Sequence, residues 1–304
     1  MREKPTMYIL PVWETVGDCY RFIWAERRAW FDYVLGPVFA VSVIPLLLMW
    51  IFLGTFQIPL GPTGLPDIER SGGSPLGMIF LIWFLMIGVY VSFAVAWHRR
   101  VLLGPDHTSA RELFSWQRRH WTYAGQCIRI LLLSIMVGIV IGFLVSIPLE
   151  IVAGVLSAQG GNPANLVALA ALTWIAAALA AFAIMAGPML AFPATAIDDT
   201  ELGIRAGWKL ARGNRWRMVG VYILGVFIPV LIVQVLLIGL IGSGLSTMEP
   251  ESLEGVRQSF SFSLIINLIS NAVYFLGVAI GMSMLSIMYR RLRDNVPSNE
   301  SASA

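Results

Sequence analysis

The sequence is poor in charge and nearly free of cysteine and lysine. Only 13% of its 304 residues are charged, against roughly 25% in soluble globular chains. Cys19 and Cys127 are the only cysteines, and their separation fits neither a thiol-redox motif nor a zinc-binding motif. In contrast, 57% of the residues are hydrophobic and the mean hydropathy is +0.75. These values exclude a disordered chain, a disulfide scaffold and a free cytosolic enzyme, and they indicate a protein whose solvent is lipid.

Long stretches without Asp, Glu, Lys or Arg divide the chain. They cover residues 33–66, 71–98, 130–149, 151–197, 218–248 and 258–289. Each is long enough for an α-helix that crosses roughly 30 Å of hydrocarbon. A polar break at Ser157 to Ala164 favours a single span within the longest stretch. The sequence therefore predicts an all-α polytopic membrane protein with six transmembrane helices, near residues 34–53, 76–96, 127–149, 165–187, 218–241 and 262–288.

The basic residues lie almost entirely on one side of these spans. Nineteen of the 21 fall in the terminal segments and alternate connections, whereas only Arg70 and Arg257 fall in the remaining loops. The positive-inside rule then predicts both termini in the cytoplasm. Eight of the eleven tryptophans lie on the same side, as expected for indole rings at a membrane interface. The short apolar run near the N-terminus does not match a signal peptide. We therefore predict a multi-pass protein of the bacterial inner membrane.

A period of 92 residues separates Trp24 from Trp116 and Trp116 from Trp208, and the same frame aligns Asp106 with Asp198. A shared period is typical of duplicated units. We predict one membrane domain, 1–304, with three tandem repeats at about 10–101, 102–193 and 194–289 and a flexible cytoplasmic tail at 290–304. Each repeat would have a cytoplasmic interfacial helix followed by two spans. In the second repeat, Ser109 and Glu112 predict a capping box.

Polar side chains recur at helical spacing in the sixth predicted span. One interpretation is the wall of a polar cavity, with the fifth span opposite, and the favoured alternative is packing between helices through amide hydrogen bonds. Spans free of ionisable residues argue against an ion-coupled transporter. The residues of this candidate cavity or packing face are Gln234, Asn267, Ser270, Asn271 and Tyr274.

Three histidines, His98, His107 and His120, lie in one predicted cytoplasmic connection with two acidic residues. Their spacing matches no pattern that places metal ligands on one helix face, so we interpret them as solvated interfacial histidines. Nucleophile elbows and phosphate-binding loops are also absent from the sequence. We therefore predict no enzymatic activity, no cofactor and no metal. An intramembrane enzyme would require a titratable cluster that sequence separation hides.

Arginine pairs and triplets mark each predicted cytoplasmic segment. Guanidinium groups can bind phosphate in a bidentate manner, and each surface cation gains about 1 kcal/mol near anionic lipid. Membrane topology alone would explain the same residues equally well. The candidate contacts with anionic lipid are Arg27, Arg28, Arg99, Arg100, Arg118, Arg119, Arg212, Arg215 and Arg217.

These patterns favour a non-enzymatic membrane module that contacts anionic lipid, or a membrane or cytoplasmic protein partner, through a cytoplasmic face rich in Trp and Arg. The alternative is a transporter or lipid translocase with a polar cavity between the repeats. The charge serves topology rather than nucleic-acid binding, which we do not expect.

The stretches 190–199 and 207–217 resemble bacterial six-helix integral membrane proteins whose function is poorly known. This group is similar to the membrane domain of glycerophosphodiester phosphodiesterases. The likeness is strongest at Trp208, Arg212, Gly213 and Trp216. It implies a membrane module that stands alone, because no soluble stretch is long enough for the catalytic barrel of those enzymes. The resemblance brings no catalytic residue to this chain.

Overall fold

The computed structural model describes residues 8–53, 75–158, 163–199, 201–246 and 260–295, and within these ranges the chain is helical and contains no strand. Short 3-10 helices η1 (Pro105–His107) and η2 (Ala110–Phe114) and a π-helix η3 (Ile223–Phe227) accompany the α-helices. The α-helices are α1 (Val12–Ala25), α2 (Arg27–Leu53), α3 (Pro75–Leu103), α4 (Arg118–Ala158), α5 (Pro163–Met189), α6 (Ala191–Ala196), α7 (Ile204–Leu210), α8 (Arg215–Tyr222), α9 (Ile228–Ser246) and α11 (Phe260–Asp294).

Within the described ranges, six helical segments are long and apolar enough to cross a membrane, which confirms the predicted number. They extend beyond the charge-free stretches, because helices continue through the arginine- and tryptophan-bearing ends. One example is α11, which ends at Asp294, so residues 290–294 of the predicted flexible tail are helical. The six segments are Arg27–Phe52, Gly77–Leu103, Arg118–Leu156, Leu166–Ala196, Arg215–Leu240 and Phe260–Asp294.

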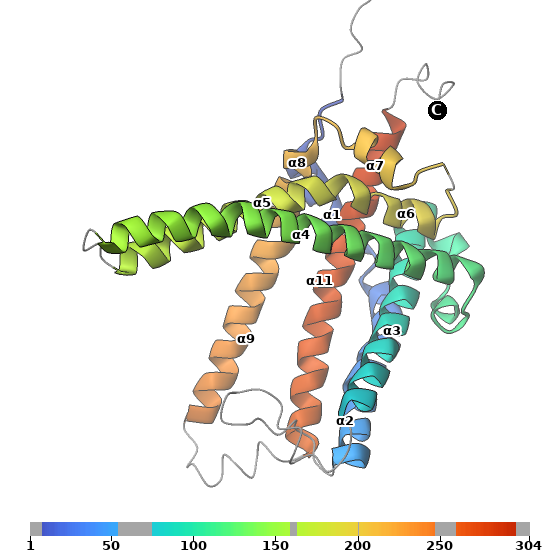
Figure 1. The fold of residues 1–304 in the computed structure, drawn as a ribbon. Helices are drawn as coiled ribbons and strands as arrows, with labels where there is room; N and C mark the ends of the chain where they lie inside the picture. The colour runs from blue at the N-terminus through green and yellow to red at the C-terminus, as the bar shows by residue number, and fades with distance from the viewer. Residues whose placement is uncertain (1–7, 54–74, 159–162, 200, 247–259, 296–304) are drawn as a thin grey trace, which may run out of the picture.

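The long helices do not form one parallel bundle. Helices α2, α3 and α11 pack side by side, and α9 runs beside them in a similar direction (Figure 1). The α4–α5 hairpin crosses the end of this group and projects far to one side. Helices α1, α6, α7 and α8 gather at the same end of the molecule, together with the carboxyl end of α11. We call this region the basic end, since most of the arginines of the described residues lie in it.

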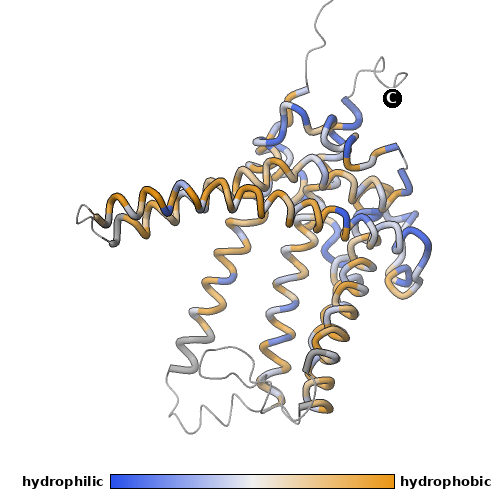
Figure 2. The backbone as a smooth tube through the Cα atoms, in the orientation of Figure 1, coloured by the Kyte–Doolittle hydropathy of each residue, from blue (hydrophilic) through white to orange (hydrophobic). Residues whose placement is uncertain are grey.

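Hydrophobic residues predominate along the projecting hairpin and α9, as the hydropathy colouring of the backbone shows (Figure 2). Phe143 on α4 is 65% exposed and Leu236 on α9 is 66% exposed. A helix that is apolar all round requires apolar surroundings, which for a polytopic chain are lipid or neighbouring helices. These helices therefore supply membrane-facing surface, whereas the packed core lies at the basic end.

Trp97 joins α3 to α11 in this core. Its indole Nε1 donates hydrogen bonds to the Ala279 carbonyl at 3.0 Å and to Ser283 Oγ at 2.9 Å. Phe93 stacks on the indole at a centroid distance of 6.0 Å, and Tyr33 approaches it edge-on at 6.1 Å. The fully buried tryptophan thus has its polar group satisfied while its rings fill the space between three helices.

A proline and two glycines shape the packing contact between α5 and α7. Pro188 has no N–H, so it cannot donate to the carbonyl of Ile184 one turn earlier. The indole Nε1 of Trp208 donates to that carbonyl instead, at 3.0 Å. The backbones cross closely, because a Cβ atom on Gly207 would lie only 2.6 Å from the carbonyl oxygen of Gly187. Small residues at the crossing therefore allow the indole to reach the open carbonyl.

The same arrangement recurs between α1 and the start of α9. Pro229 cannot donate to the Gly225 carbonyl, which lies in the π-helix η3. The hydroxyl of Tyr20 donates to this oxygen at 2.8 Å. Burial raises the pKa of Tyr20 above its ordinary value, so the phenol keeps the proton that it donates. Helix α1 is thereby attached to the fifth span.

The segments that precede the three pairs of spans differ in structure. The first is the 14-residue helix α1 and the third contains the 7-residue helix α7, but the second forms only η1 and η2. The predicted capping box is wrong, since the Ser109 side chain makes no capping hydrogen bond. Gly104, at φ 87°, and Pro105 end α3, and the chain then turns into α4 through single helical turns. The threefold repeat stays a prediction, and Arg70, Arg257 and residues 296–304 lie outside the described residues.

Candidate functional site

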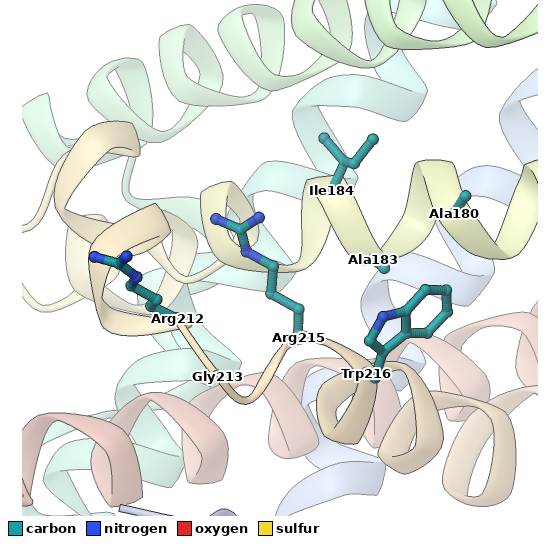
Figure 3. A pocket seen from close by; sticks show the side chains of 7 residues that line it. All are labelled: Ala180, Ala183, Ile184, Arg212, Gly213, Arg215 and Trp216. Atoms are coloured by element: carbon teal, nitrogen blue, oxygen red, sulfur yellow. The ribbon is translucent and has the colours of Figure 1, made fainter. Parts of the chain in front are cut away.

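A pocket of about 450 Å³ opens between α5 and the turn that joins α7 to α8 (Figure 3). We call it the α5 pocket. One wall comes from α5 and the other from the turn and the first residues of α8. Its lining residues are Ala180, Ala183, Ile184, Arg212, Gly213, Arg215 and Trp216.

The two arginines give the pocket its charge. Neither Arg212 nor Arg215 forms an ion pair with any residue that the structure describes, and the lining includes no carboxylate. The Arg215 guanidinium carbon lies 5.6 Å from the centre of the Trp208 ring, a distance that fits a cation–π interaction. Its Nε is buried and has no hydrogen-bond partner among the described residues. The pocket is therefore positively charged and has unused hydrogen-bond donors.

The opposite wall is apolar and built from small side chains. Ala180 and Ala183 lie on the face of α5 that meets the turn, and their short side chains leave the space that the pocket occupies (Figure 3). Trp216 is 64% exposed at the edge of the pocket. Guanidinium groups, an exposed indole and an apolar wall together match a ligand with one anionic part and one apolar part.

The turn that carries the arginines is fixed by the N-terminal segment. Gly213, with φ 80°, reverses the chain after α7. The side chain of the buried Asn214 then accepts a hydrogen bond from the Leu10 N–H at 2.8 Å and donates to the Tyr8 carbonyl at 2.8 Å. Arg217 also donates to the Leu10 carbonyl, at 3.3 Å. These contacts fix the path of the backbone between Arg212 and Arg215.

The predicted ring of arginines divides into two groups. Arg99, Arg100 and Arg119 are half-buried and interact with acidic residues inside the protein. Arg100, for example, donates from Nη2 and Nε to the Glu26 carboxylate at 2.6 and 3.1 Å. These three arginines therefore form ion pairs within the basic end. The exposed members are Arg27, Arg28, Arg118, Arg212 and Arg217, and Arg215 is partly exposed.

The polar face of α11 is divided between packing and surface. Asn271 donates to Ser42 Oγ at 3.0 Å and so links α11 to α2, whereas Asn267 donates to the Ser263 carbonyl of its own helix at 2.8 Å. Ser270 and Tyr274 are exposed, and Gln234 is half-buried on α9. None of the five predicted residues lines the α5 pocket. The Asn271 hydrogen bond contributes to packing between α11 and α2, and the role of the five residues as a cavity or packing face stays a prediction.

No family model, curated protein or solved structure matches this chain. The resemblance to the membrane domain of glycerophosphodiester phosphodiesterases therefore stays a prediction. The function of the α5 pocket is therefore inferred from the chemistry and geometry of its lining residues alone.

Two of the three histidines are buried, so their interpretation as solvated residues is wrong. His98 faces α11, and its Nδ1 lies 2.7 Å from Ser286 Oγ. His120 is packed against Trp116 at a centroid distance of 5.3 Å and accepts a hydrogen bond from the Gln117 N–H. The charged residues near them in the sequence suggested that these rings are exposed to solvent, but both rings are buried where helices meet at the basic end. Only His107 is exposed, and no group of three potential metal ligands occurs among the described residues.

The sequence did not reveal the apolar half of the α5 pocket. Ala180 and Ala183 resemble every other alanine of an alanine-rich helix, and only the crossing of α5 with α7 makes them part of a site. Gly187, Pro188 and Gly207 were the available signal. Together they mark a place where a second backbone can approach a helix and where one carbonyl lacks its helical donor.

Proposed function

We propose that the chain is a non-enzymatic membrane module that binds an anionic phospholipid in the α5 pocket. The observation that carries this proposal is the combination of an apolar wall with two arginines, Arg212 and Arg215, that form no ion pair with the described residues. A phosphodiester fits the guanidinium groups, and the first carbons of an acyl chain fit the wall. We place the protein in a bacterial inner membrane with the basic end toward the cytoplasm, in agreement with the distribution of arginine and tryptophan in the sequence.

The position of the pocket supports a lipid over a soluble ligand. Helices α5 and α8 both belong to segments long and apolar enough to span a membrane, and the pocket lies beside the start of the segment Arg215–Leu240, which carries Arg215 and Arg217. A bound headgroup would thus lie at interface depth, where exposed indoles such as Trp216 are favourable. Desolvation by the apolar wall would also strengthen the interaction between phosphate and guanidinium.

Lipid binding by purified full-length protein tests the proposal. In zwitterionic detergent micelles, fluorescently labelled phosphatidylglycerol should bind more tightly than labelled phosphatidylcholine. Replacing Arg212 and Arg215 with Gln removes two charge-assisted contacts, so affinity for phosphatidylglycerol should fall about tenfold or more.

Arg205→Gln with Lys209→Gln provides the matched control, because both residues are exposed on α7, outside the pocket, and the loss of charge is equal. The control should bind phosphatidylglycerol nearly as the unmodified protein does. Equal weakening by the two double variants would mean that net charge, and not the pocket, attracts the lipid.

A lipid translocase is the second candidate, favoured by polar side chains exposed on a spanning helix. Ser270 and Tyr274 lie one turn apart on α11, and both are exposed. Such groups could guide a headgroup along α11. Reconstituted liposomes with labelled lipid should then show transbilayer movement that slows on replacing Ser270 with Ala and Tyr274 with Phe. Transbilayer movement no faster than in protein-free liposomes would exclude this function.

A further inference from the structure

A second group of arginines meets at the junction of α3, α4 and α6, away from the α5 pocket. Arg99 lies near the end of α3, Arg119 near the start of α4, and Asp198 just beyond α6. Asp198 Oδ2 lies 3.9 Å from Nη1 of Arg99 and 3.9 Å from Nη1 of Arg119. Glu112 Oε2 lies 3.6 Å from Arg99 Nε. These distances allow electrostatic attraction but exceed those of charge-assisted hydrogen bonds.

The guanidinium groups are largely unsatisfied despite their burial. The side chains of Arg99 and Arg119 are only 13% and 23% exposed. Arg99 donates one long hydrogen bond, to the Ala196 carbonyl at 3.4 Å, and Arg119 donates none to the described part of the chain. Arg99 Nε and Arg119 Nη1 are buried atoms that have ionic neighbours but no hydrogen-bond partner in the described part of the chain. Buried donors of this strength normally have acceptors, so the cluster lacks an acceptor with several oxygens.

His120 adds a third unsatisfied donor beside Arg119. The ring is 2% exposed, and its Nδ1 accepts the Gln117 N–H at 3.0 Å. The neutral ring therefore carries its proton on Nε2. This nitrogen is buried and also has no partner in the described residues. Both arginines are close enough to interact electrostatically with the imidazole.

Asp198 is held weakly and in an unusual conformation. Its φ of 61° makes it the one non-glycine residue with positive φ in the described ranges. Its side chain is 59% exposed, so the carboxylate that faces both arginines is also well solvated. A carboxylate can leave such a position for water at little cost.

We propose that Arg99 and Arg119 form a phosphate-binding site in which the Asp198 carboxylate is a displaceable competitor. With Asp198 turned into solvent, two guanidinium groups face the single carboxylate of Glu112. The remaining charge of +1 matches a singly charged phosphodiester, whose free oxygens would accept from Arg99, Arg119 and His120. This site shares no residue with the α5 pocket, and the proposal is independent of lipid binding there.

Isothermal titration calorimetry of detergent-solubilised full-length protein tests the site with two probes, inorganic phosphate and short-chain phosphatidylglycerol. Asp198→Asn removes the competing charge, so at least one probe should bind about tenfold more tightly. Asp106→Asn is the matched control, since Asp106 is an exposed aspartate at the same end, without a recorded ion pair among the described residues. Arg119→Gln, combined with Asp198→Asn, should abolish the gain.

The two probes distinguish the source of the phosphate. A gain with both probes assigns the site to a phosphate group in general, and a gain with the lipid alone assigns it to a headgroup. Equal affinities of the Asp198 and Asp106 variants for both probes would overturn the proposal. It would also fail if the gain disappeared on replacing Arg212 and Arg215 but persisted without Arg119. If Arg119→Gln prevents folding, the comparison of the two aspartate variants still decides the question.

Discussion

The hydrogen bond between Trp208 and the Ile184 carbonyl gives a quantitative test of how α5 and α7 are held together. Trp208→Phe keeps an aromatic ring at the crossing but removes the Nε1 donor, which lies 3.0 Å from the carbonyl oxygen. The oxygen has no replacement from its own helix one turn later, because residue 188 is proline. An unsatisfied carbonyl costs about 1–3 kcal/mol when it is fully buried, so at this partly buried position the free energy of unfolding should fall by about 1–2 kcal/mol.

The second half of the test restores the missing donor. In a Pro188→Ala background the alanine N–H can donate to the Ile184 carbonyl, so Trp208→Phe should cost less than about 1 kcal/mol. The loss of cation–π energy with Arg215 affects both backgrounds and cancels in the double-mutant cycle. The expected coupling energy is therefore about 1–2 kcal/mol.

Reversible unfolding of the detergent-solubilised protein by SDS, followed by circular dichroism, would measure the four free energies. Trp216→Phe is the control, since Trp216 is exposed and has no recorded hydrogen bond among the described residues. We expect its effect to stay within about 0.5 kcal/mol. A Trp208→Phe cost that is the same with and without the Pro188→Ala substitution would refute the role assigned to the open carbonyl.

Three further predictions follow from the basic end. Tyr20→Phe should lower the free energy of unfolding by about 0.5–1.5 kcal/mol in the same assay, because the hydrogen bond that it removes is only partly buried. Since burial raises the pKa of Tyr20, the stability from its protonated phenol should be full below pH 10.0 and lost as the pH rises through the higher folded pKa, a loss that the variant should lack. Gly207→Ala would place a Cβ 2.6 Å from the Gly187 carbonyl oxygen and should lower the free energy of unfolding by about 1–3 kcal/mol. The control Gly203→Ala adds a Cβ where there is open space and should lower it by well under about 1 kcal/mol. Equal losses would contradict the close crossing. Burial raises the pKa of the Cys19 thiol to about 12, so maleimide should label this thiol at neutral pH only after unfolding. The assay uses the Cys127→Ser variant, in which Cys19 is the one remaining thiol. Rapid labelling of this variant in its native state would contradict the burial of Cys19.

The sequence predicted the number and approximate position of the membrane helices because both depend on local composition. A stretch such as 218–248 has no charge, and its preference for lipid does not depend on what surrounds it. The direction of the α4–α5 hairpin could not be predicted in the same way. After Arg129, α4 has one charged residue, Glu150, and α5 has none, so the projecting part of the hairpin has no polar face that must contact the remaining helices.

The sequence predicted the arginines of the α5 pocket but not its apolar wall. Arg212 and Arg215 stood out because the basic residues of this chain are absent from the interiors of the predicted spans and mark their ends. Whether an arginine remains free depends on its tertiary neighbours, as Arg100 and its partner Glu26 illustrate, 74 residues apart. His98 shows the same limit, since its burial depends on Ser286, which lies 188 residues away.

Charge pairing explains why free positive charge gathers at the α5 pocket. The segment 204–222 contains five basic residues, from Arg205 to Arg217, and no acidic residue. The closest acids before it in the chain are already engaged: Asp198 faces Arg99 and Arg119, while Asp199 and Glu201 both interact with Arg293. Among the described residues no carboxylate lines the pocket or pairs with Arg212, Arg215 or Arg217, so these guanidinium groups can attract an external anion. An added carboxylate should therefore weaken lipid binding most when it is placed in the pocket, so Ala180→Glu should reduce phosphatidylglycerol affinity more than Ala178→Glu, on an exposed position of the same helix. Equal reductions, measured with the labelled lipid in micelles, would mean that the charge of the whole basic end, and not its local pairing, sets the affinity.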